Sequence, residues 1–445
     1  MKLFGTDGIR GKAGNPPLDR DTVVRIGAAI VRGLDGPRPT APRVLIGRDT
    51  RESGVTIEAD LARGLTTEGA AVVSAGVIPT PGVAYLTRTE GFDAGIVISA
   101  SHNPFDDNGI KVFSGRGKKL DEDFEGRIER LVAETPPIPD GGDVAIGSDP
   151  DLGRHYVAHL RQLLSSADTL AGSTIVVDCA NGATAPIAPD LFRSLGFDVR
   201  ALGDRPDGRN INLHCGSTHL DLLRDAVAES HARLGIAFDG DGDRALFIDR
   251  HGRTVDGDAV LLIAAEDLQR RGRLGGNAVV ATVMSNIGLE LALRARGIEL
   301  VRAPVGDKYV MDEMLKRGLA LGGEQSGHVI LADHLFTGDG MATALTVLRI
   351  MDDTGRELDE LAAALKTYPQ VLVNVKVRER TDYMQIPAIA ASIERVEARV
   401  KGQGRLLIRY SGTEPLLRIM LEGKDNDEIR AWATEIADVV RENLG

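Results

Sequence analysis

The sequence is poor in cysteine. Only two of its 445 residues are cysteines, Cys179 and Cys215, and neither belongs to a Cys-x-x-Cys pair. This argues against a thiolate metal site and against a disulfide framework. Long hydrophobic runs are also missing: no apolar stretch is long enough to span a bilayer, and the first residues turn polar at once, unlike a signal peptide. We therefore expect a cytoplasmic protein.

An excess of positive charge is absent as well. The chain has 53 Lys and Arg against 65 Asp and Glu, which gives a formal net charge of −12. This balance argues against nucleic acid and against an anionic membrane as partners. A phosphorylated small molecule is still compatible with it, because a local basic cluster can receive a phosphate.

What the chain has is length and regular alternation. A chain of 445 residues is too long for one hydrophobic core, so three or four domains are expected. Short apolar runs at residues 44–47, 175–178 and 278–282 are each followed by a polar turn and a helical pattern. Such alternation is typical of βαβ units with mostly parallel sheets.

Three units of this kind end in an unusual loop. The predicted late strands are residues 95–98, 235–238 and 319–321, and the loops that follow are residues 99–104, 239–244 and 322–328. This is a weak internal triplication at a spacing of roughly a hundred residues. Ligands of open parallel sheets bind beyond the carboxyl ends of the strands, so three such loops would face a common cleft.

The last part of the chain has a different pattern. Residues 371–377 alternate like a half-exposed strand, a helical pattern covers residues 383–400, and further strands and a final helix follow. This predicts a smaller α+β domain with antiparallel pairing. Together with boundaries near Asp151, Arg253 and Tyr368, it gives the predicted domains 1–151, 152–253, 254–368 and 369–445.

Three carboxylates, Asp239, Asp241 and Asp243, alternate with glycines directly after a predicted strand. Such carboxylates repel one another unless a cation lies among them, and oxygen ligands alone suit Mg²⁺. A calcium EF-hand does not fit, because Arg244 and Arg250 stand at its glycine and glutamate positions. The alternative is a solvated Asp/Gly turn. We expect Arg244 to cap a carboxylate or to reach a phosphate.

Ser101 follows another predicted strand. A turn or capping serine is the commoner role of a serine before Asn-Pro, whereas a serine-hydrolase nucleophile is disfavoured because the segment is not Gly-x-Ser-x-Gly. His102 would moreover point away from Ser101 if strand geometry persisted. A phosphoserine is the sharper hypothesis, since its phosphate would complete the ligands of the metal.

Other polar residues are candidates for proton transfer and phosphate binding. Lys111 would have a lowered pKa near a cation and act as a general base, unless it is a surface lysine. His328 is either a structural hydrogen-bonding group or a site residue. The glycine-bracketed loop around Arg10 suggests a loop folded over a ligand. In residues 409–415, a guanidinium, hydroxyls and a glycine amide form either a phosphate-binding nest or a polar β-turn.

Four of these segments, taken in order, resemble the motifs of the α-D-phosphohexomutase superfamily: residues 99–104, 239–244, 323–328 and 409–413. Gln325 and the segments 4–11, 210–219 and 282–288 resemble the members that act on glucosamine phosphates. The resemblance implies three tandem α/β domains with mixed sheets plus a C-terminal α+β domain, all around one central cleft.

It also implies an isomerase that interconverts glucosamine 6-phosphate and glucosamine 1-phosphate through a phosphoserine and a 1,6-bisphosphate, in UDP-N-acetylglucosamine synthesis for the cell wall. A homodimer is expected. The implied residues are phosphorylated Ser101 with Asp239, Asp241 and Asp243 for Mg²⁺; Lys111, Arg10 and His328 for proton transfer; and Arg244, Glu324, Ser326, Arg409, Ser411, Gly412 and Thr413 for the substrate.

Three rival functions remain open from the sequence. One is a phosphoglucomutase or phosphomannomutase of the same superfamily. Another is a non-catalytic sugar-phosphate sensor, which would be expected to lose Ser101 or one of the aspartates. The third is a Mg²⁺-dependent phosphatase, which would release phosphate stoichiometrically.

Overall fold

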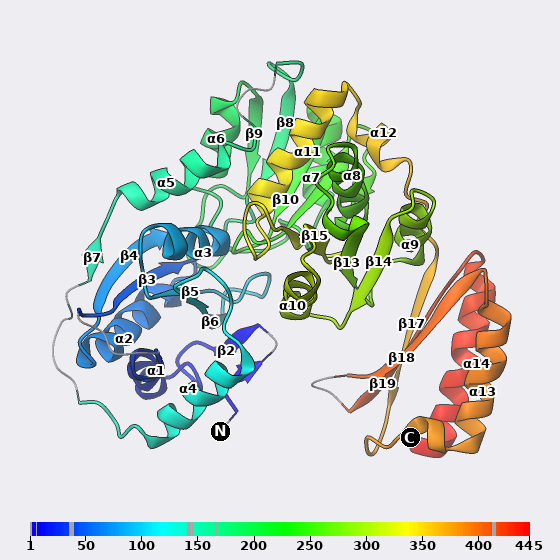
Figure 1. Cartoon of the computed structure of the whole chain (residues 1–445), viewed down its shortest axis with the longest axis horizontal. Coiled ribbons are helices and arrows are strands. Elements are labelled where there is room, and N and C mark those ends of the chain that lie inside the picture. Colours follow the sequence, from blue (N-terminus) through cyan, green and yellow to red (C-terminus); the bar gives the residue numbers. More distant parts are fainter. Residues whose placement is uncertain are drawn as a thin grey trace. The chain divides into compact units, whose positions relative to one another are not determined.

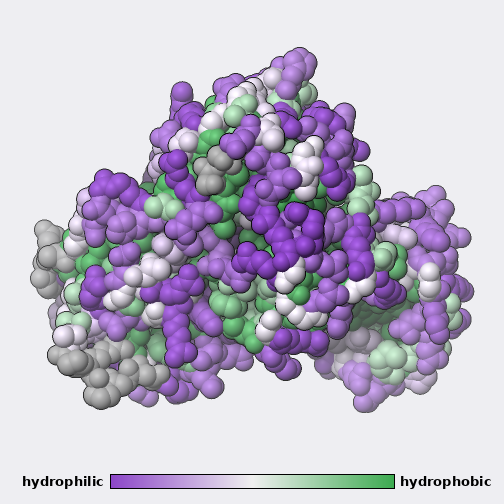
Figure 2. Space-filling view, turned by 45° about the horizontal axis from the view of Figure 1, so that its top comes forward, coloured by the Kyte–Doolittle hydropathy of each residue, from purple (hydrophilic) through white to green (hydrophobic). Residues whose placement is uncertain are grey.

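A computed structural model of the chain describes residues 2–5, 7–34, 40–139, 144, 146–164, 168–411 and 415–445. The chain divides into two compact units, Met1–Met284 with Leu300–Ala363 and Ser285–Glu299 with Ala364–Gly445. Figure 1 shows the elements of each unit. Within the described ranges, no helix combines the length and the apolar character that a membrane span requires. Hydrophilic side chains cover most of the face drawn in Figure 2.

The first unit begins with a seven-stranded mixed sheet of order β1-β2-β6-β5-β3-β4-β7. Strands β3, β4, β5 and β7 are parallel, and β6 runs antiparallel to both β5 and β2. The strands are β1 (Phe4–Gly5), β2 (Gly8–Lys12), β3 (Arg43–Arg48), β4 (Ala71–Val77), β5 (Ala94–Ile98), β6 (Asp107–Ser114) and β7 (Gly147–Ser148).

Helices cover both faces of this sheet (Figure 1). Ile46 and Ile96 belong to the core beneath α1 (Arg20–Gly33), α2 (Ser53–Thr67) and α4 (Glu122–Glu134). On the opposite face, Gly47 and Gly95 let α3 (Thr80–Thr89) pack closely: a Cβ on Gly47 would lie 2.4 Å from Val83. This packing brings the N-terminus of α3 to the carboxyl edge of the sheet, where the loop after β5 lies.

A second sheet has five strands in the order β12-β11-β10-β8-β9. Strands β8, β9 and β10 are parallel, and β11 forms an antiparallel hairpin with β10. The elements are α5 (Asp151–Leu160), β8 (Thr174–Asp178), α6 (Ala188–Ser194), β9 (Asp198–Leu202), α7 (Asp221–Ser230), β10 (Leu234–Phe238), β11 (Ala245–Asp249) and β12 (Thr254–Val255).

A third sheet has four strands in the order β14-β13-β15-β16, with β13 and β15 parallel and β16 antiparallel to β15. Its buried residues Val280 and Ile330 pack with Met314 of α10. The elements are α8 (Gly257–Arg270), η1 (Gly275–Asn277), β13 (Ala278–Thr282), β14 (Glu299–Ala303), α10 (Asp307–Arg317), β15 (Leu321–Gly323), β16 (Val329–Leu331), α11 (Gly340–Thr354) and α12 (Leu358–Ala362).

One arrangement recurs in the three sheets: a parallel strand runs into a polar loop and returns as an antiparallel partner. The pairs are β5 with β6, β10 with β11, and β15 with β16. The predicted triplication is therefore present as three strand–loop–strand units, and each loop holds one of the segments singled out in the sequence.

The second unit contains a three-stranded antiparallel sheet of order β17-β19-β18. Its apolar face, with Ile419 and Leu421, packs with Val396 and Ile436 of the helices. The elements are α9 (Ile287–Arg294), β17 (Gln370–Lys376), η2 (Tyr383–Gln385), α13 (Pro387–Val400), β18 (Gly404–Tyr410), β19 (Leu416–Gly423) and α14 (Asn426–Leu444).

The α/β class with mixed sheets and a C-terminal α+β part is confirmed by these sheets. One predicted element differs: the helical pattern at residues 383–400 is a short 3₁₀ turn followed by α13, which starts at Pro387. The residue before a proline is pushed toward extended geometry, and Ile386 has φ −92° and ψ 109°. The proline therefore begins the helix.

Candidate active site

Ser101 lies in the loop after β5 in a left-handed backbone conformation, with φ 52°. Three contacts hold the turn: its N–H donates to Ser99 Oγ (2.9 Å), and its carbonyl accepts from Asn212 Nδ2 (2.9 Å) and Arg51 Nη2 (3.2 Å). The buried hydroxyl donates to Asp239 Oδ2 at 2.6 Å. The Ser101 hydroxyl thus contacts a carboxylate of another loop, whereas the hydroxyl of a capping serine would contact the backbone of its own turn.

The side chain of His102 also faces Ser101. Its Nδ1 lies 3.3 Å from Ser101 Oγ, so the expectation that His102 points away is wrong. The reason is the positive φ at Ser101, which ends the alternation of the strand. Burial, together with nearby Arg244 and Arg10, lowers the pKa of His102 to about 4, so this imidazole is neutral at neutral pH.

The three aspartates of the second loop converge as predicted. Asp239, Asp241 and Asp243 are all buried, and one oxygen of each lies within 4.8 Å of the others. Gly242, with φ 71°, provides the bend between the last two. Thr80, at the start of α3, fixes the middle one by donating from its backbone N–H to the Asp241 carbonyl (2.9 Å) and from its hydroxyl to Asp241 Oδ2 (2.6 Å).

Two oxygens of this cluster show that it suits a cation. Asp241 Oδ1 and Asp243 Oδ1 are buried, and among the described residues neither accepts a hydrogen bond. A buried carboxylate oxygen with no donor is costly, and a hard divalent cation is the ligand that a set of oxygens alone prefers. The residues present therefore fit a metal ion.

Mutual repulsion is visible in the pKa values. Burial, together with Asp243 and Asp241, raises the pKa of Asp239 well above its ordinary value. Burial raises the pKa of Asp243 too, but Lys111 and His328 outweigh it, and the net shift is downward. The cluster thus depends on positive charge beside it.

Lys111, on β6, supplies part of that charge. Its Nζ lies 2.9 Å from Asp241 Oδ2, 3.0 Å from Asp7 Oδ2 and 3.5 Å from Asp243 Oδ2, and its side chain is 2% exposed. Burial lowers the pKa of Lys111, but the three carboxylates outweigh it and raise the pKa well above its ordinary value. The predicted lowering of this pKa depends on a cation beside Lys111 and stays a prediction, since the groups that face the ammonium here are carboxylates.

Two arginines flank the same loops. Arg10, on β2, donates to the Ala100 carbonyl (2.8 Å) and pairs with Asp7. Arg244 follows the last aspartate; its backbone N–H donates to Asp239 Oδ1 (3.2 Å), and its Nε lies 3.8 Å from Asp243 Oδ1. Burial lowers the pKa of Arg244, but the surrounding carboxylates raise it above the ordinary value, so it remains a cation.

The third loop adds Glu324, Ser326 and His328. His328 Nδ1 lies 3.5 Å from Asp243 Oδ2, and its Nε2 accepts from the Gly338 N–H at 3.0 Å. Ser326 Oγ donates to Glu324 Oε2 at 3.3 Å. The first unit therefore brings together Ser101, the aspartates, Lys111, Arg10, Arg244 and His328, with Glu324 and Ser326 on the loop that carries His328.

Comparison with known proteins places this geometry in a family. Models of the phosphoglucomutase/phosphomannomutase family match the chain in four consecutive parts: alpha/beta/alpha domain I at residues 1–137, domain II at 154–252, domain III at 256–368 and the C-terminal domain at 372–439. Two relatives called phosphoglucosamine mutase cover the whole chain. The protein of Solibacter usitatus is 52% identical over 99% of its own length, and that of Geotalea daltonii 48% over 98%.

The chain belongs to the phosphoglucosamine mutase family. Solved structures share the fold. A phosphoglucomutase/phosphomannomutase family protein of Burkholderia thailandensis has a TM-score of 0.80 at 24% identity, covering 99% of this chain and 98% of its own. The N-acetylphosphoglucosamine mutase of Aspergillus fumigatus, in complex with GlcNAc-6P and magnesium, has a TM-score of 0.66 at 19% identity, covering 100% and 96%.

One part of the expected mutase site lies in the second unit. Arg409 is on β18 directly opposite Arg418 of β19, and Ser411 is buried. Burial and Arg418 lower the pKa of Arg409. Gly412 and Thr413 lie outside the described residues, so their role as phosphate ligands stays a prediction.

Two carboxylates that contact predicted site residues, Asp7 and Asp307, were not predicted from the sequence. Asp7 joins Lys111 and Arg10, and Asp307 lies 3.5 Å from His328 Nε2. The glycine-bracketed loop was a signal for Asp7, since it is the only carboxylate within residues 5–11. Asp307 gave no signal, because only the packing of α10 brings it to the other loops.

Proposed function

We propose that this chain interconverts glucosamine 6-phosphate and glucosamine 1-phosphate through a phosphorylated Ser101 and a 1,6-bisphosphate intermediate. The product would enter UDP-N-acetylglucosamine synthesis for the cell wall. The observation that carries the proposal is the contact of Ser101 Oγ with Asp239, beside two carboxylate oxygens that lack a hydrogen-bond donor in the described chain.

The proposed reaction has two phosphoryl transfers. In the first, the phosphorus–oxygen bond to Ser101 breaks while one to the 1-oxygen of glucosamine 6-phosphate forms, which gives the bisphosphate. In the second, after the bisphosphate has turned over in the site, the phosphorus–oxygen bond at its 6-oxygen breaks and that phosphoryl group returns to Ser101 Oγ. The 1-oxygen keeps its phosphate. The number of phosphates on the enzyme is then unchanged after each cycle.

Protons move with these transfers, and Lys111 would carry them. Its ammonium group is held by Asp7 and Asp241, the latter in the loop of Asp239, the residue that Ser101 contacts. It would donate a proton to the departing oxygen and recover one from the attacking hydroxyl. Arg10 and His328 assist by binding the phosphoryl oxygens and the adjacent hydroxyl.

Asp239, Asp241 and Asp243, together with a phosphate on Ser101, would hold Mg²⁺. When bound, this ion neutralises the negative charge that spreads over the phosphoryl group during transfer. Arg244 would reach the same oxygens.

The remaining predicted residues bind the substrate. Glu324 and Ser326 would accept and donate hydrogen bonds to sugar hydroxyls. Arg409, Ser411, Gly412 and Thr413 would hold the phosphate that is not reacting. A clamp of this kind accepts a phosphate at either end of the sugar, which explains how the bisphosphate can turn over while Ser101 stays fixed.

A phosphate-transfer experiment tests the proposal. The protein is incubated with ³²P-labelled glucose 1,6-bisphosphate, and both the label on protein and the mutase rate are measured. We expect the label on Ser101, and we expect Ser101→Ala to lose the label and at least about a thousandfold in rate. Ser114→Ala, at the end of β6, is the matched control. A Ser101→Ala protein with wild-type turnover would refute the phosphoserine.

Location and assembly are part of the same proposal. A cytoplasmic site agrees with two cysteines that are both free thiols and buried. A homodimer stays a prediction, which the mass of the protein in solution tests.

A further inference from the structure

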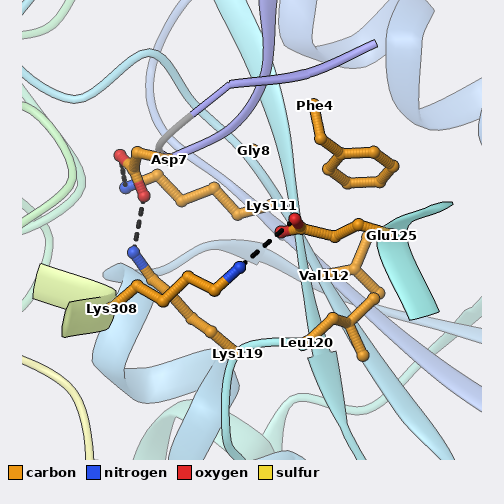
Figure 3. A pocket seen from close by; sticks show the side chains of 9 residues that line it. All are labelled: Phe4, Asp7, Gly8, Lys111, Val112, Lys119, Leu120, Glu125 and Lys308. Carbon is orange, nitrogen blue, oxygen red and sulfur yellow. Dashed lines mark hydrogen bonds and ion pairs between the residues drawn. The ribbon is translucent and has the colours of Figure 1, made fainter. Parts of the chain in front are cut away.

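Lys119 connects two segments that are far apart in the sequence. It lies between β6 and α4, and its Nζ contacts Asp7 Oδ1 at 2.5 Å and also pairs with Asp307 at the first position of α10. Figure 3 shows the Asp7 carboxylate between the ammonium groups of Lys111 and Lys119. Lys119 thereby joins the turn between β1 and β2 to the start of α10.

This lysine is held as a largely buried cation. Its side chain is 12% exposed, as is that of Asp307. Burial lowers the pKa of Lys119, but Asp307 and Asp7 outweigh it and raise the pKa above the ordinary value. A backbone bridge between Phe113 and Lys119 fixes where the side chain starts. Burying a charge is costly unless it is paired, so removal of one partner would leave uncompensated charge on the others.

Both ends of this bridge lead to residues of the proposed reaction. On one side, Asp7 Oδ2 lies 3.0 Å from Lys111 Nζ and pairs with Arg10. On the other side, Asp307 follows Gly306, whose N–H donates to Glu324 Oε1 at 3.2 Å.

We propose that Lys119 is a positioning residue of the phosphoryl-transfer reaction. By bridging Asp7 and Asp307, it holds Lys111 and Arg10 in place relative to the loop that receives the sugar. This inference rests on the function proposed above. Lys119 itself touches no reacting atom; it acts through Asp7, so its loss would lower the rate of the chemical step more than it weakens substrate binding.

A pocket lined by Asp7, Lys111 and Lys119 also contains a matched control, Lys308. The Nζ of Lys308 pairs with Glu125 (3.4 Å) and Glu122 (3.7 Å), neither of which contacts a predicted site residue in the described chain. Figure 3 shows Lys308 directed at Glu125 and away from Asp7. The two lysines therefore share burial and chemistry but differ in what they join.

The experiment compares kcat and KM for glucosamine 6-phosphate in the full chain carrying Lys119→Met, Lys119→Arg or Lys308→Met. We expect Lys119→Met to lower kcat at least tenfold with KM changed less than threefold. Lys119→Arg should recover part of the loss, and Lys308→Met should stay within twofold of wild type. A Lys119→Met enzyme within twofold of wild type in kcat would overturn the proposal, as would an equal loss in Lys308→Met.

A second variant keeps the test decisive if Lys119→Met does not fold. Asp307→Asn has the same shape and removes the charge that faces Lys119 and His328, so it should also lower kcat at least tenfold. If Asp307→Asn keeps wild-type kcat, the bridge does no positioning. The wild-type assay separates the two proposals: inactivity of the unaltered protein on hexosamine phosphate counts against the function, whereas an active wild type with indifferent variants counts against Lys119 alone.

Discussion

At the scale of single residues, electrostatic repulsion within the aspartate cluster is the main feature of the site. Asp239 has a raised pKa because it is buried beside two other carboxylates. A group whose pKa is raised on folding binds more protons in the folded state, so ionising it at neutral pH destabilises the fold. The ionised Asp239 therefore lowers the stability of the metal-free fold at the position where a cation would bind.

We therefore expect Asp239→Asn, measured in EDTA at pH 7.5, to be more stable than wild type by on the order of 1 kcal/mol. The amide keeps both contacts of the carboxylate, since its oxygen accepts from the Arg244 N–H and its NH₂ donates to Ser101 Oγ. Magnesium should raise the thermal midpoint of wild type and leave that of the variant unchanged. Thermal unfolding with and without Mg²⁺ measures this. A variant less stable than wild type in EDTA would contradict the repulsion.

A stacked histidine pair predicts a pH dependence of stability. The His159 ring stacks on Tyr85 at 4.0 Å and on His334 at 4.4 Å between ring centroids. Burial, with His334 and Arg88, outweighs the opposing effect of Asp339 and lowers the pKa of His159 to about 4.

His159 takes up a proton below about pH 6.5 in the unfolded chain but only near pH 4 in the folded protein. The free energy of unfolding should therefore fall as the pH drops from about 6.5 to 4. His159 is partly exposed, so its share is on the order of 1 kcal/mol. Urea unfolding of wild type and His159→Gln across this range measures it: the difference between the two should change with pH. A constant difference would show that His159 does not titrate there.

The residues found from the sequence and those missed differ in a physical way. Ser101 and the three aspartates lie in short loops directly after strands, and such loops meet at one edge of a sheet. Asp307 and Lys119 meet through contacts across 188 positions. His102 was misplaced because a positive φ at a serine is not visible in the residue pattern.

At the scale of elements, the strand–loop–strand unit explains why three loops of different sequence share one site. The loops are also braced by neighbours outside the unit. Residues 179–184, after β8, support the aspartate loop, since the Ala183 N–H donates to the Gly240 carbonyl at 2.8 Å. Gly182 lies against the same residue: a Cβ there would lie 2.3 Å from the Gly240 oxygen and 2.7 Å from its Cα.

Gly182→Ala should therefore displace the aspartate loop. Both clashing atoms are backbone, so the side chain cannot be relieved by a rotamer change. We expect at least a tenfold loss in kcat and about 1–3 kcal/mol in stability. Gly153→Ala in α5 is the control, since nothing lies within 4 Å of its Cβ, and it should be neutral or slightly stabilising. Steady-state rates and unfolding curves of both variants test this prediction. Wild-type activity in Gly182→Ala would show that the contact of residues 179–184 with Gly240 does not position the aspartate loop.

Element type was predictable from periodicity, and element edges were less so. The predicted strand at residues 319–321 is found two residues later, as β15 at Leu321–Gly323. The strand includes two glycines, which the sequence pattern assigned to the following loop. The glycines of the first sheet illustrate the same limit: Gly47 stands where α3 approaches, and no local pattern announces that helix.

At the scale of the whole molecule, four family domains are carried by two compact units. The first unit contains Ser101, the aspartates and the loop proposed to bind the sugar. The second contains the predicted domain 369–445 together with Ser285–Glu299, and it carries Arg409 and Ser411. The residues proposed for phosphoryl transfer thus belong to the first unit, and Arg409 and Ser411 of the proposed phosphate clamp belong to the second. A domain count was predictable from length and from the change of pattern near Tyr368, whereas the inclusion of α9 in the second unit depends on packing.

The central claim is that the substrate is a glucosamine phosphate. The measurement that tests it most directly is kcat/KM of the purified protein on glucosamine 6-phosphate, glucose 6-phosphate and mannose 6-phosphate, with Mg²⁺ and a trace of hexose 1,6-bisphosphate. We predict that glucosamine 6-phosphate is preferred by at least about tenfold, or roughly 1.4 kcal/mol of transition-state stabilisation. A preference for glucose or mannose 6-phosphate would contradict the claim, as would the absence of turnover with all three when Ser101 is phosphorylated.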